Sequence, residues 1–365
     1  MAFTYTEEQR ALRDLVRDLC GEVARNRDAA EGGNSGDPDL WRGLAAAGML
    51  TLGIPEGRGG AGGSVVDQTI VAQELGRVAS PAPFVTSTMM AGRLLASAEP
   101  RDDVIEAMAA GVKVACLLDQ PDVRTVDNGV VNGSARLVID GPGADTLLVA
   151  ATAANGVVVG SVEAAKTVVI AHATVDRGRP LATITFDDTP IDLLGGRDEG
   201  WGNAIVEATL VGQLGLAAES AGVAQRCLEL AAAYALTRKQ FGEIIGQFQA
   251  IKHMLADMLV MSENAVAAVQ LGAFALDGNG DDVQLSVAAA KATATDAAVQ
   301  VAGDAMQVHG GISITWEHDL HLYLRRAKTN QQLLGEPTDH RETIAARLLA
   351  VEQPPQGGPR GQTAA

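Results

Sequence analysis

The sequence predicts an α+β fold in which a helical N-terminal domain precedes an antiparallel β domain and a C-terminal four-helix bundle. Apolar residues recur at helical spacing up to about residue 112 and again beyond residue 200. Between them, short β-branched runs are separated by Gly, Asn and Asp. We expect domains at 1–112, 113–199 and 200–350, and a disordered Pro- and Gly-rich tail at 351–365.

Composition and charge exclude several classes of protein. The 365 residues are 47% hydrophobic and 20% charged, which is enough apolar material for a large core. The net charge of −17 opposes binding to nucleic acid or to anionic membranes. No apolar run approaches the ~20 residues of a membrane span, so no membrane insertion is expected. Three cysteines without a C-x-x-C pair, and an N-terminus without a secretory signal, predict a cytoplasmic protein.

Four helices are expected in the N-terminal domain. Thr6 and Gln9 have the spacing of a capping box, and apolar residues then recur every three or four positions. A short second helix is expected at 40–47, a third at 65–78 and a fourth at 84–96.

The middle of the chain predicts a sheet or a small barrel. Seven β-branched runs fall within about 85 residues, without the intervening helices of a dinucleotide-binding βαβ fold. Because turn residues directly separate them, we expect antiparallel pairing. The runs are 114–118, 130–131, 135–139, 146–150, 157–162, 167–172 and 182–186.

Beyond residue 200 the spacing of apolar residues predicts five helices. The stretch 277–282, with three Asp, two Gly and one Asn, marks the clearest turn between two of them. The helices are expected at 203–237, 246–276, 282–306, 317–334 and 339–350.

Two common motifs carry little weight here. Residues 57–62 satisfy G-x-G-x-x-G, but no strand precedes them, so a turn between helices is the better interpretation. His318 and His321 lie three apart near His309, yet no suitably placed carboxylate completes a ligand set, and we expect no metal site. No G-x-S-x-G elbow supports acyl-transfer hydrolysis.

Two segments of the predicted bundle carry groups suited to a phosphate ligand. Arg238 stands where a helix ends, before the Phe241-Gly242 turn, and a guanidinium there can form paired hydrogen bonds to a phosphate. Gly310-Gly311 follows a long helix and lets a ligand approach bare backbone amides. Two helix C-caps and a surface arginine explain the same residues equally well, so local chemistry leaves both interpretations open.

These segments resemble the signature motifs of the flavin-dependent acyl-CoA dehydrogenase family, and the resemblance covers most of the chain. Residues 53–62 resemble the family's P-E-x-x-G-G-x-G loop, and Glu74-Leu75-Gly76 resembles its E-L-G segment. Residues 288–311 are similar to its A-K helix and G-G turn. The resemblance implies FAD as cofactor and the α,β-dehydrogenation of an acyl-CoA thioester to the 2-enoyl-CoA.

In this family each FAD is bound across a subunit interface. The bundle of one subunit holds the pyrophosphate and adenosine of a flavin whose ring belongs to its neighbour. The resemblance assigns this role to the arginine of R-x-x-F-G with its phenylalanine, to a glutamine eleven residues after the arginine, and to the Q-x-x-G-G turn. In this chain these residues are Arg238, Phe241, Gln249, Gln307, Gly310 and Gly311.

The other half of the family's site is missing. Aligned through Arg325-Arg326-Ala327-Lys328 on the family's R-D-A-K helix, the catalytic glutamate falls on Leu334. The position that some relatives use instead falls on Gly212. Neither residue can accept a proton. The segments 118–123 and 135–139 also depart from the family's flavin-ring motifs.

The resemblance therefore implies a non-catalytic subunit of a heterotetrameric (α2β2) acyl-CoA dehydrogenase. Such enzymes occur among actinobacteria and act on bulky steroid-derived thioesters. A homologous partner would supply the base, and an electron-transfer flavoprotein could accept the electrons. Two alternatives stay open. A homo-oligomeric flavoenzyme would use a relocated base, Glu336 or Glu219, and a flavin-free scaffold would need none.

Overall fold

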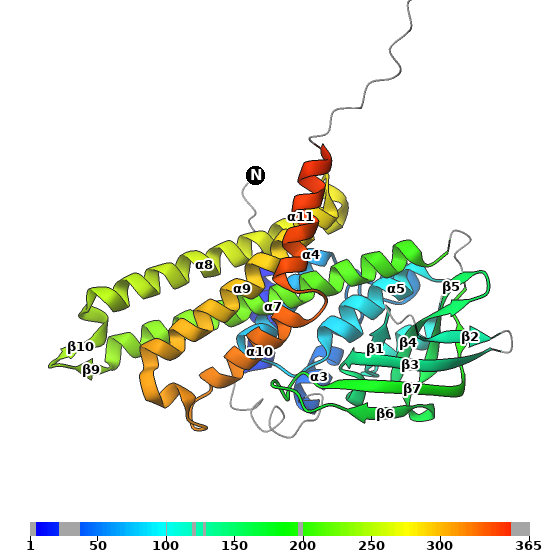
Figure 1. Cartoon of the computed structure of the whole chain (residues 1–365), viewed down its shortest axis with the longest axis horizontal. Helices are drawn as coiled ribbons and strands as arrows, with labels where there is room; N and C mark the ends of the chain where they lie inside the picture. The colour runs from blue at the N-terminus through cyan, green and yellow to red at the C-terminus, as the bar shows by residue number, and fades with distance from the viewer. Residues whose placement is uncertain are drawn as a thin grey trace, which may run out of the picture.

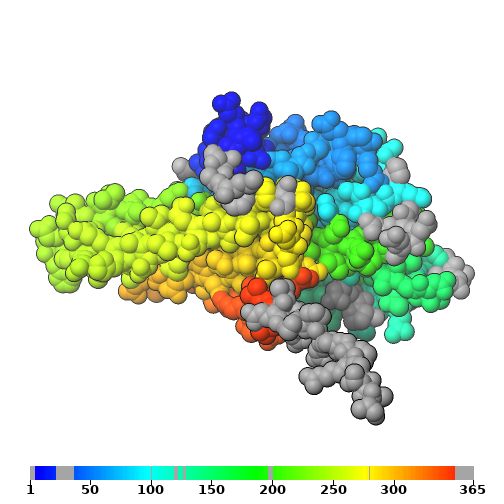
Figure 2. Space-filling model, turned by 90° about the horizontal axis from the view of Figure 1, so that it is seen from above, coloured from blue at the N-terminus to red at the C-terminus, as the bar shows by residue number. Residues whose placement is uncertain are grey.

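The computed structural model describes residues 5–21, 37–99, 101–118, 122–126, 129–195 and 200–351. Helices, a sheet and a helical bundle follow one another in the predicted order. In Figure 1 the bundle extends to the left and the sheet lies to the right. Figure 2 shows the first helices, in blue, on one side of the molecule. The tail that the sequence predicts to be disordered lies outside the described residues from residue 352 onward.

All four helices predicted in the N-terminal domain are present. The capping box is confirmed, since Thr6 Oγ1 accepts from the Gln9 amide at 3.2 Å and Gln9 Oε1 accepts from the Thr6 amide at 3.1 Å. The fourth begins as a π-helix, and one further short helix lies beyond the prediction. The helices are α1 Glu7–Cys20, α3 Pro38–Ala46, α4 Val65–Arg77, η3 Val85–Met90 continued by α5 Ala91–Ser97, and the additional α6 Asp102–Ala109.

The middle domain is one eight-stranded sheet. Its strands run in the order β6-β7-β3-β2-β4-β5-β8, and β1 pairs with β4. Two predicted runs merge into the single long strand β3, and the short strands β2 and β8 are additional. The strands are β1 Val114–Leu117, β2 Arg124–Val126, β3 Val130–Ile139, β4 Thr146–Ala153, β5 Gly156–Glu163, β6 Val168–Ala171, β7 Leu181–Pro190 and β8 Asp192–Leu193.

The expectation of purely antiparallel pairing needs a correction. β4 pairs parallel with both β1 and β2, while the other described pairings in this sheet are antiparallel. The reason is topological: β1 and β4 are not consecutive, and the chain forms β2 and β3 before it returns beside β1. Turn residues between neighbouring runs predict the local hairpins but carry no signal about which distant strands pair.

The five helices predicted for the C-terminal region are all present. α7, α8, α9 and α10 form the bundle, and α11 packs on α9. A two-stranded hairpin, β9 Lys239–Gln240 and β10 Glu243–Ile244, joins α7 to α8 and lies at the far left tip of Figure 1. The helices are α7 Gly202–Thr237, α8 Gln249–Phe274, α9 Val283–His309, α10 Leu320–Gln332 and α11 Pro337–Val351.

Helix α8 corrects the expectation that no segment is apolar enough to cross a membrane. By length and composition the stretch Gln249–Gly278 could span one, with a mean hydropathy of 1.4. The helix packs against α7 and α9, with Met258, Ala265 and Val269 buried in the shared core. Because 39% of the apolar window is buried, its place in the bundle accounts for part of its apolar composition.

Helices α4 and α7 cross at unusually close range because each has a glycine at the contact. A Cβ on Gly76 would stand 2.1 Å from the carbonyl oxygen of Glu219. A Cβ on Gly222 would stand 1.9 Å from the carbonyl oxygen of Gln73. Any side chain at either position would collide with backbone, so Gly76 of the E-L-G segment is required by this crossing.

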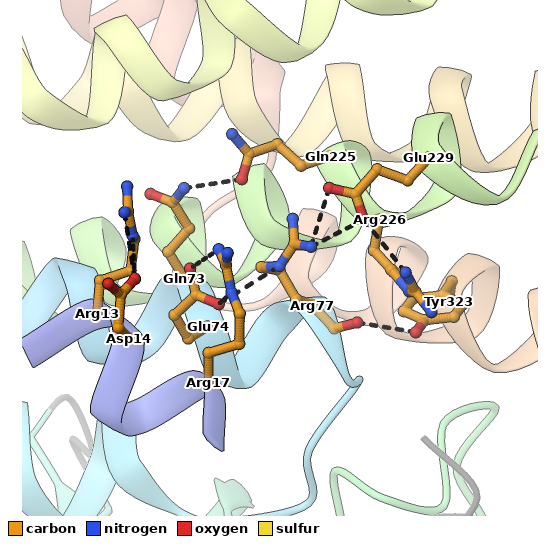
Figure 3. A network of polar contacts seen from close by, with 10 residues as sticks. All are labelled: Arg13, Asp14, Arg17, Gln73, Glu74, Arg77, Gln225, Arg226, Glu229 and Tyr323. Atoms are coloured by element: carbon orange, nitrogen blue, oxygen red, sulfur yellow. Dashed lines mark hydrogen bonds and ion pairs between the residues drawn. The ribbon is translucent and has the colours of Figure 1, made fainter. Parts of the chain in front are cut away.

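Glu74 and Arg77, on either side of Gly76, form the centre of a polar network shown in Figure 3. Glu74 is buried and accepts two hydrogen bonds from Arg17 of α1, at 2.9 and 2.8 Å. Arg77 approaches Glu74 to 3.4 Å and pairs with Glu229 of α7 at 2.8 Å. The Tyr323 hydroxyl of α10 donates to the Arg77 carbonyl at 2.8 Å. The network therefore joins the N-terminal helices to two helices of the bundle.

Candidate functional site

The residues assigned to the nucleotide of FAD gather at one end of the bundle. Arg238 caps the C-terminus of α7, and the hairpin that follows carries Phe241 at its tip, 94% exposed. Gln249 begins α8, while Gln307 lies in the last turn of α9. Gly310 and Gly311 follow directly. The ring of Tyr234 in the last turn of α7 stacks on that of His309 at the end of α9, which places these segments side by side.

This end of the bundle fits an anionic ligand. The Arg238 side chain is exposed, and within the part of the chain that the structure describes its guanidinium makes no ion pair. Gly311 is exposed, and a Cβ there would meet nothing within 4 Å. No contact within the described part of the chain would therefore exclude a side chain at this position. A guanidinium without an ion pair and the open backbone at Gly311 suit a pyrophosphate, whereas the Gly310 amide already donates to the carbonyl oxygens of Met306 and Gln307.

A second feature, here named the Leu334 pocket, lies between the sheet and the bundle, far from the hairpin. Its volume is about 330 Å³. Its lining is mostly apolar and contains no carboxylate, imidazole or amine. The lining residues are Thr86, Met90, Cys116, Leu118, Leu137, Val138, Ile139, Thr209, Gln213, Leu334 and Gly335.

The two sequence positions that the resemblance assigns to the family's base adjoin one another at this pocket. Leu334 lines it, and its Cδ1 lies 3.0 Å from where a Cβ on Gly212 would stand. Burial raises the pKa of the Cys116 thiol, which stays protonated at neutral pH. The lining side chains thus provide no group that could remove a proton from a substrate.

Neither weak candidate for a relocated base lines the pocket. Glu219 is 1% exposed and holds Arg179 at 2.7 Å, while the Asn330 side chain donates to it at 3.1 Å. The Glu219 carboxylate thus forms a buried ion pair. Glu336 is exposed at the start of α11, where its amide donates to Asp339 at 2.9 Å. The geometry supports neither carboxylate as the base.

A buried polar chain runs behind the pocket from the sheet to the bundle. Arg179 is fully buried and lies 3.4 Å from Asp140 and within hydrogen-bonding distance of Glu219. Asp140 accepts from the hydroxyl of Thr86, a lining residue, at 2.7 Å. Burial raises the pKa of Asp140, and the charge of Arg179 opposes that rise. These hydrogen bonds and ion pairs fix one wall of the pocket to α7.

The polar chain continues to the opposite wall through Lys291 of α9. Its ammonium is fully buried and donates to the carbonyl oxygens of Asn330, at 2.9 Å, and Gly335, at 3.1 Å. Gln213 donates to the Leu334 carbonyl at 3.1 Å. Both Leu334 and Gly335 have positive φ angles, 56° and 101°. Hydrogen bonds from two helices thus hold a turn in which leucine adopts an unfavourable positive φ angle.

We expect Lys291 to make stability rise with pH. Burial lowers the pKa of Lys291 to about 8, against a smaller opposing effect of Asp296 and Asp339. Between about pH 8 and pH 10.5 the unfolded chain keeps this proton and the folded chain loses it, so raising the pH favours folding. The full effect is on the order of 3 kcal/mol. Urea denaturation across this window measures it.

Lys291→Met is the matched control, because it removes the titrating amine and keeps most of the side-chain volume. Its free energy of unfolding should rise less steeply with pH than that of the wild type above pH 8. Parallel curves for the two proteins would contradict the assignment.

A second buried ion pair joins sheet and bundle at a position where the chain departs from its family motif. Arg326 stands in place of the acid of R-D-A-K and is 1% exposed. It donates to Asp176 at 2.5 Å and to the Ser80 carbonyl at 2.5 Å. The reversed charge is therefore matched by an acid from the loop between β6 and β7.

The remaining sequence motifs have structural roles. The predicted turn between helices is confirmed for residues 59–62, which precede α4, whereas residues 57 and 58 end a short 3-10 helix. A Cβ on Gly60 would clash with the Ile54 carbonyl at 2.2 Å. The ring of His318 packs edge-on against His309, and that of His321 against Trp316. Among the described residues, no group of three His, Cys, Asp or Glu is placed to hold a metal.

Several residues of the site escape the sequence analysis. Arg179 and Asp140 lie in short connections of the sheet, where no motif marks them, and only the fold brings them to Glu219. Lys291 belongs to the A-K helix that the resemblance identifies, so a buried lysine there was a usable signal. The segment 118–123 can be compared only in part, because residues 119–121 lie outside the described residues.

A helical domain, a sheet and a long helical bundle, in this order, are the architecture of the acyl-CoA dehydrogenase fold. Residues 6–112 match the model of the acyl-CoA dehydrogenase N-terminal domain, and residues 198–349 match that of the C-terminal domain. The chain belongs to the acyl-CoA dehydrogenase family, whose cofactor is FAD.

Similar proteins include mycobacterial ones. The chain is 36% identical over 342 residues to acyl-CoA dehydrogenase IpdE2 of Mycobacterium tuberculosis, covering 92% of this chain and 96% of that protein. It is 37% identical over 359 residues to acyl-CoA dehydrogenase FadE34 of the same organism. That match covers 92% of this chain but only 47% of FadE34, so the chain spans about half of that relative's length.

Solved structures with the same fold include two complexes. A chain of the ChsE4–ChsE5 complex from Mycobacterium tuberculosis superposes with a TM-score of 0.86 at 29% identity, covering 97% of this chain and 100% of that one. A chain of the Tcur3481–Tcur3483 steroid acyl-CoA dehydrogenase superposes with a TM-score of 0.82 at 25% identity, covering 94% and 98%. This chain thus has heteromeric enzymes of its family among its structural neighbours.

Proposed function

We propose that the chain is the non-catalytic subunit of a heteromeric, FAD-dependent acyl-CoA dehydrogenase. Its bundle end supplies the groups for the pyrophosphate and adenosine of FAD, and a homologous partner supplies the flavin-ring contacts and the catalytic glutamate. Bound FAD accepts the hydride in the oxidation of an acyl-CoA to its 2-enoyl-CoA. Arg238 and the backbone of the glycine turn at Gly311 would hold the negative charge of the pyrophosphate.

The observation that carries the proposal is that both base positions meet at one pocket and neither is ionisable. Gly212, beside this pocket, and Arg238, at the nucleotide-binding end, lie on the same helix. Twenty-six positions separate them along α7 and its C-cap, roughly 39 Å at about 1.5 Å per residue. This separation supports a nucleotide-binding end that serves a flavin ring held by another subunit.

The nature of the relatives supports a partner of the same family. Two structural neighbours are complexes of two different proteins, and one of these is described as a steroid acyl-CoA dehydrogenase. FadE34 is about twice as long as this chain, which leaves room for a second unit of equal size in one polypeptide. By this analogy a bulky, steroid-type CoA ester is the proposed substrate class. An electron-transfer flavoprotein remains the proposed acceptor.

Co-expression tests the proposal directly. The chain should be purified alone and together with the product of an adjacent acyl-CoA dehydrogenase-like gene. We expect a colourless protein alone and a yellow complex that oxidises acyl-CoA with the partner. Yellow, active protein from the chain alone would instead support the homo-oligomeric alternative. A complex without flavin would support the scaffold.

Arg238→Ala is expected to weaken FAD retention by the complex. A charge-assisted hydrogen bond contributes about 1.5–3 kcal/mol, so the Kd for FAD should rise by about 10- to 150-fold. Fluorescence of released flavin during dilution measures the loss. Arg10→Ala, which removes an exposed arginine on α1, is the control and should retain FAD like the wild type. Equal retention in both variants would rule out the role assigned to Arg238.

A further inference from the structure

Two aromatic rings connect the halves of the nucleotide-binding end. The rings of Tyr234 and His309 are stacked, with centroids 4.3 Å apart and planes inclined by 23°. The Arg238 amide donates to the Tyr234 carbonyl at 2.9 Å, so stack and arginine share the last turn of α7. His309 directly precedes Gly310. The stack therefore stands between the arginine on α7 and the glycine turn after α9.

The imidazole of His309 is held in a fixed orientation. It is 6% exposed, and its Nδ1 lies 2.8 Å from the Ala305 carbonyl oxygen. Because a carbonyl can only accept, Nδ1 must carry the proton in this contact. The rings of His318 and His309 pack edge to face, with their centroids 4.8 Å apart. Burial lowers the pKa of His309, which leaves the stacked ring neutral near neutral pH.

The turn beyond His309 is anchored from the same helix. The Ser313 hydroxyl contacts the Met306 carbonyl oxygen at 3.0 Å and the Gly310 carbonyl oxygen at 2.7 Å. By contrast, a Cβ on Gly310 or on Gly311 would meet nothing within 4 Å. The turn is thus supported from the helix side and open on the side that a ligand would approach.

We propose that Tyr234 and His309 are positioning residues that set the spacing between Arg238 and the open glycine turn at Gly311 for a pyrophosphate. This inference rests on the proposed function. The arginine and the glycine turn lie on different helices, and no described hydrogen bond or ion pair joins them directly. Fixing both groups before binding lowers the entropy lost when a ligand engages them together.

The test uses the complex with its partner subunit and measures the Kd for FAD from the fluorescence of released flavin. Tyr234→Ala and His309→Ala should each raise this Kd by about 2- to 10-fold, the effect expected from losing one aromatic pair. Tyr234→Phe keeps the ring and should bind FAD like the wild type. The melting temperature of each flavin-free complex reports separately on folding.

The outcomes separate this inference from the proposed function. If Arg238→Ala weakens FAD binding and Tyr234→Ala does not, the positioning role is wrong and the function stands. If none of these substitutions changes the Kd, the function fails as well. Equal damage by Tyr234→Phe and Tyr234→Ala would also overturn the inference, since the ring would not be the cause. If the alanine variant does not fold, Tyr234→Leu, which fills the same space without an aromatic ring, decides.

Discussion

Arg179→Met should destabilise the chain by about 3–5 kcal/mol, the usual cost of removing one partner from a buried charge network. Arg179 is fully buried and holds Glu219 and Asp140, which are themselves 1% and 2% exposed. Without the guanidinium, two carboxyl groups would face each other in the interior, and at least one would have to take up a proton. Urea denaturation of the purified chain at pH 7 measures the loss.

Two further variants check the cause. Arg179→Met combined with Glu219→Gln removes the uncompensated charge and should recover a substantial part of the loss. Arg42→Ala breaks the exposed pair of Arg42 with Asp39 and should change stability by less than about 1 kcal/mol. A loss as small for Arg179→Met as for Arg42→Ala would show that the buried network does not hold sheet and bundle together.

Gly222→Ala should cost about 3 kcal/mol or more, although it adds a single methyl group. That methyl would stand 1.9 Å from the Gln73 carbonyl oxygen, and neither helix backbone can yield locally. The helices α4 and α7 would have to separate, which also disturbs the contacts of Gln73 with Gln225 and of Arg77 with Glu229. Thermal unfolding followed by far-UV circular dichroism measures the effect.

Gly303→Ala is the matched control for this substitution. Gly303 also lies inside a bundle helix, α9, but a Cβ there would meet nothing within 4 Å. Alanine should stabilise this position by about 0.5–1 kcal/mol, because it favours the helix without a clash. Similar effects of the two substitutions would contradict the steric explanation.

Much of the fold could be predicted from the sequence because long periodic segments specify their own local structure. The helices at 203–237 and 65–78 follow from apolar spacing alone, and Thr6 with Gln9 marks a helix start. The strands β2 and β8 could not be predicted in this way, because strands of three and two residues are too short to show an alternation of apolar and polar residues. The parallel pairing of β1 with β4 depends on the whole sheet.

In the candidate site, too, contiguous motifs could be predicted from the sequence and contacts between distant segments could not. The motif around Arg238 is contiguous, and its exposure at the bundle end agrees with a role in binding. The Leu334 pocket is built from segments up to about 250 residues apart in the sequence. Its lining and the contacts of Asp140 with Thr86 and Arg179 can therefore be identified only from the structure. That Gly212 and Leu334 adjoin one another also follows only from the structure.

The ion pair of Arg326 with Asp176 makes each of its two residues depend on the other. Changing Arg326 to the aspartate of the R-D-A-K motif would place two acids against each other in the interior. Changing Asp176 alone would leave the buried guanidinium without a counter-charge. Either single substitution therefore unbalances the interior, and only a paired exchange keeps it neutral.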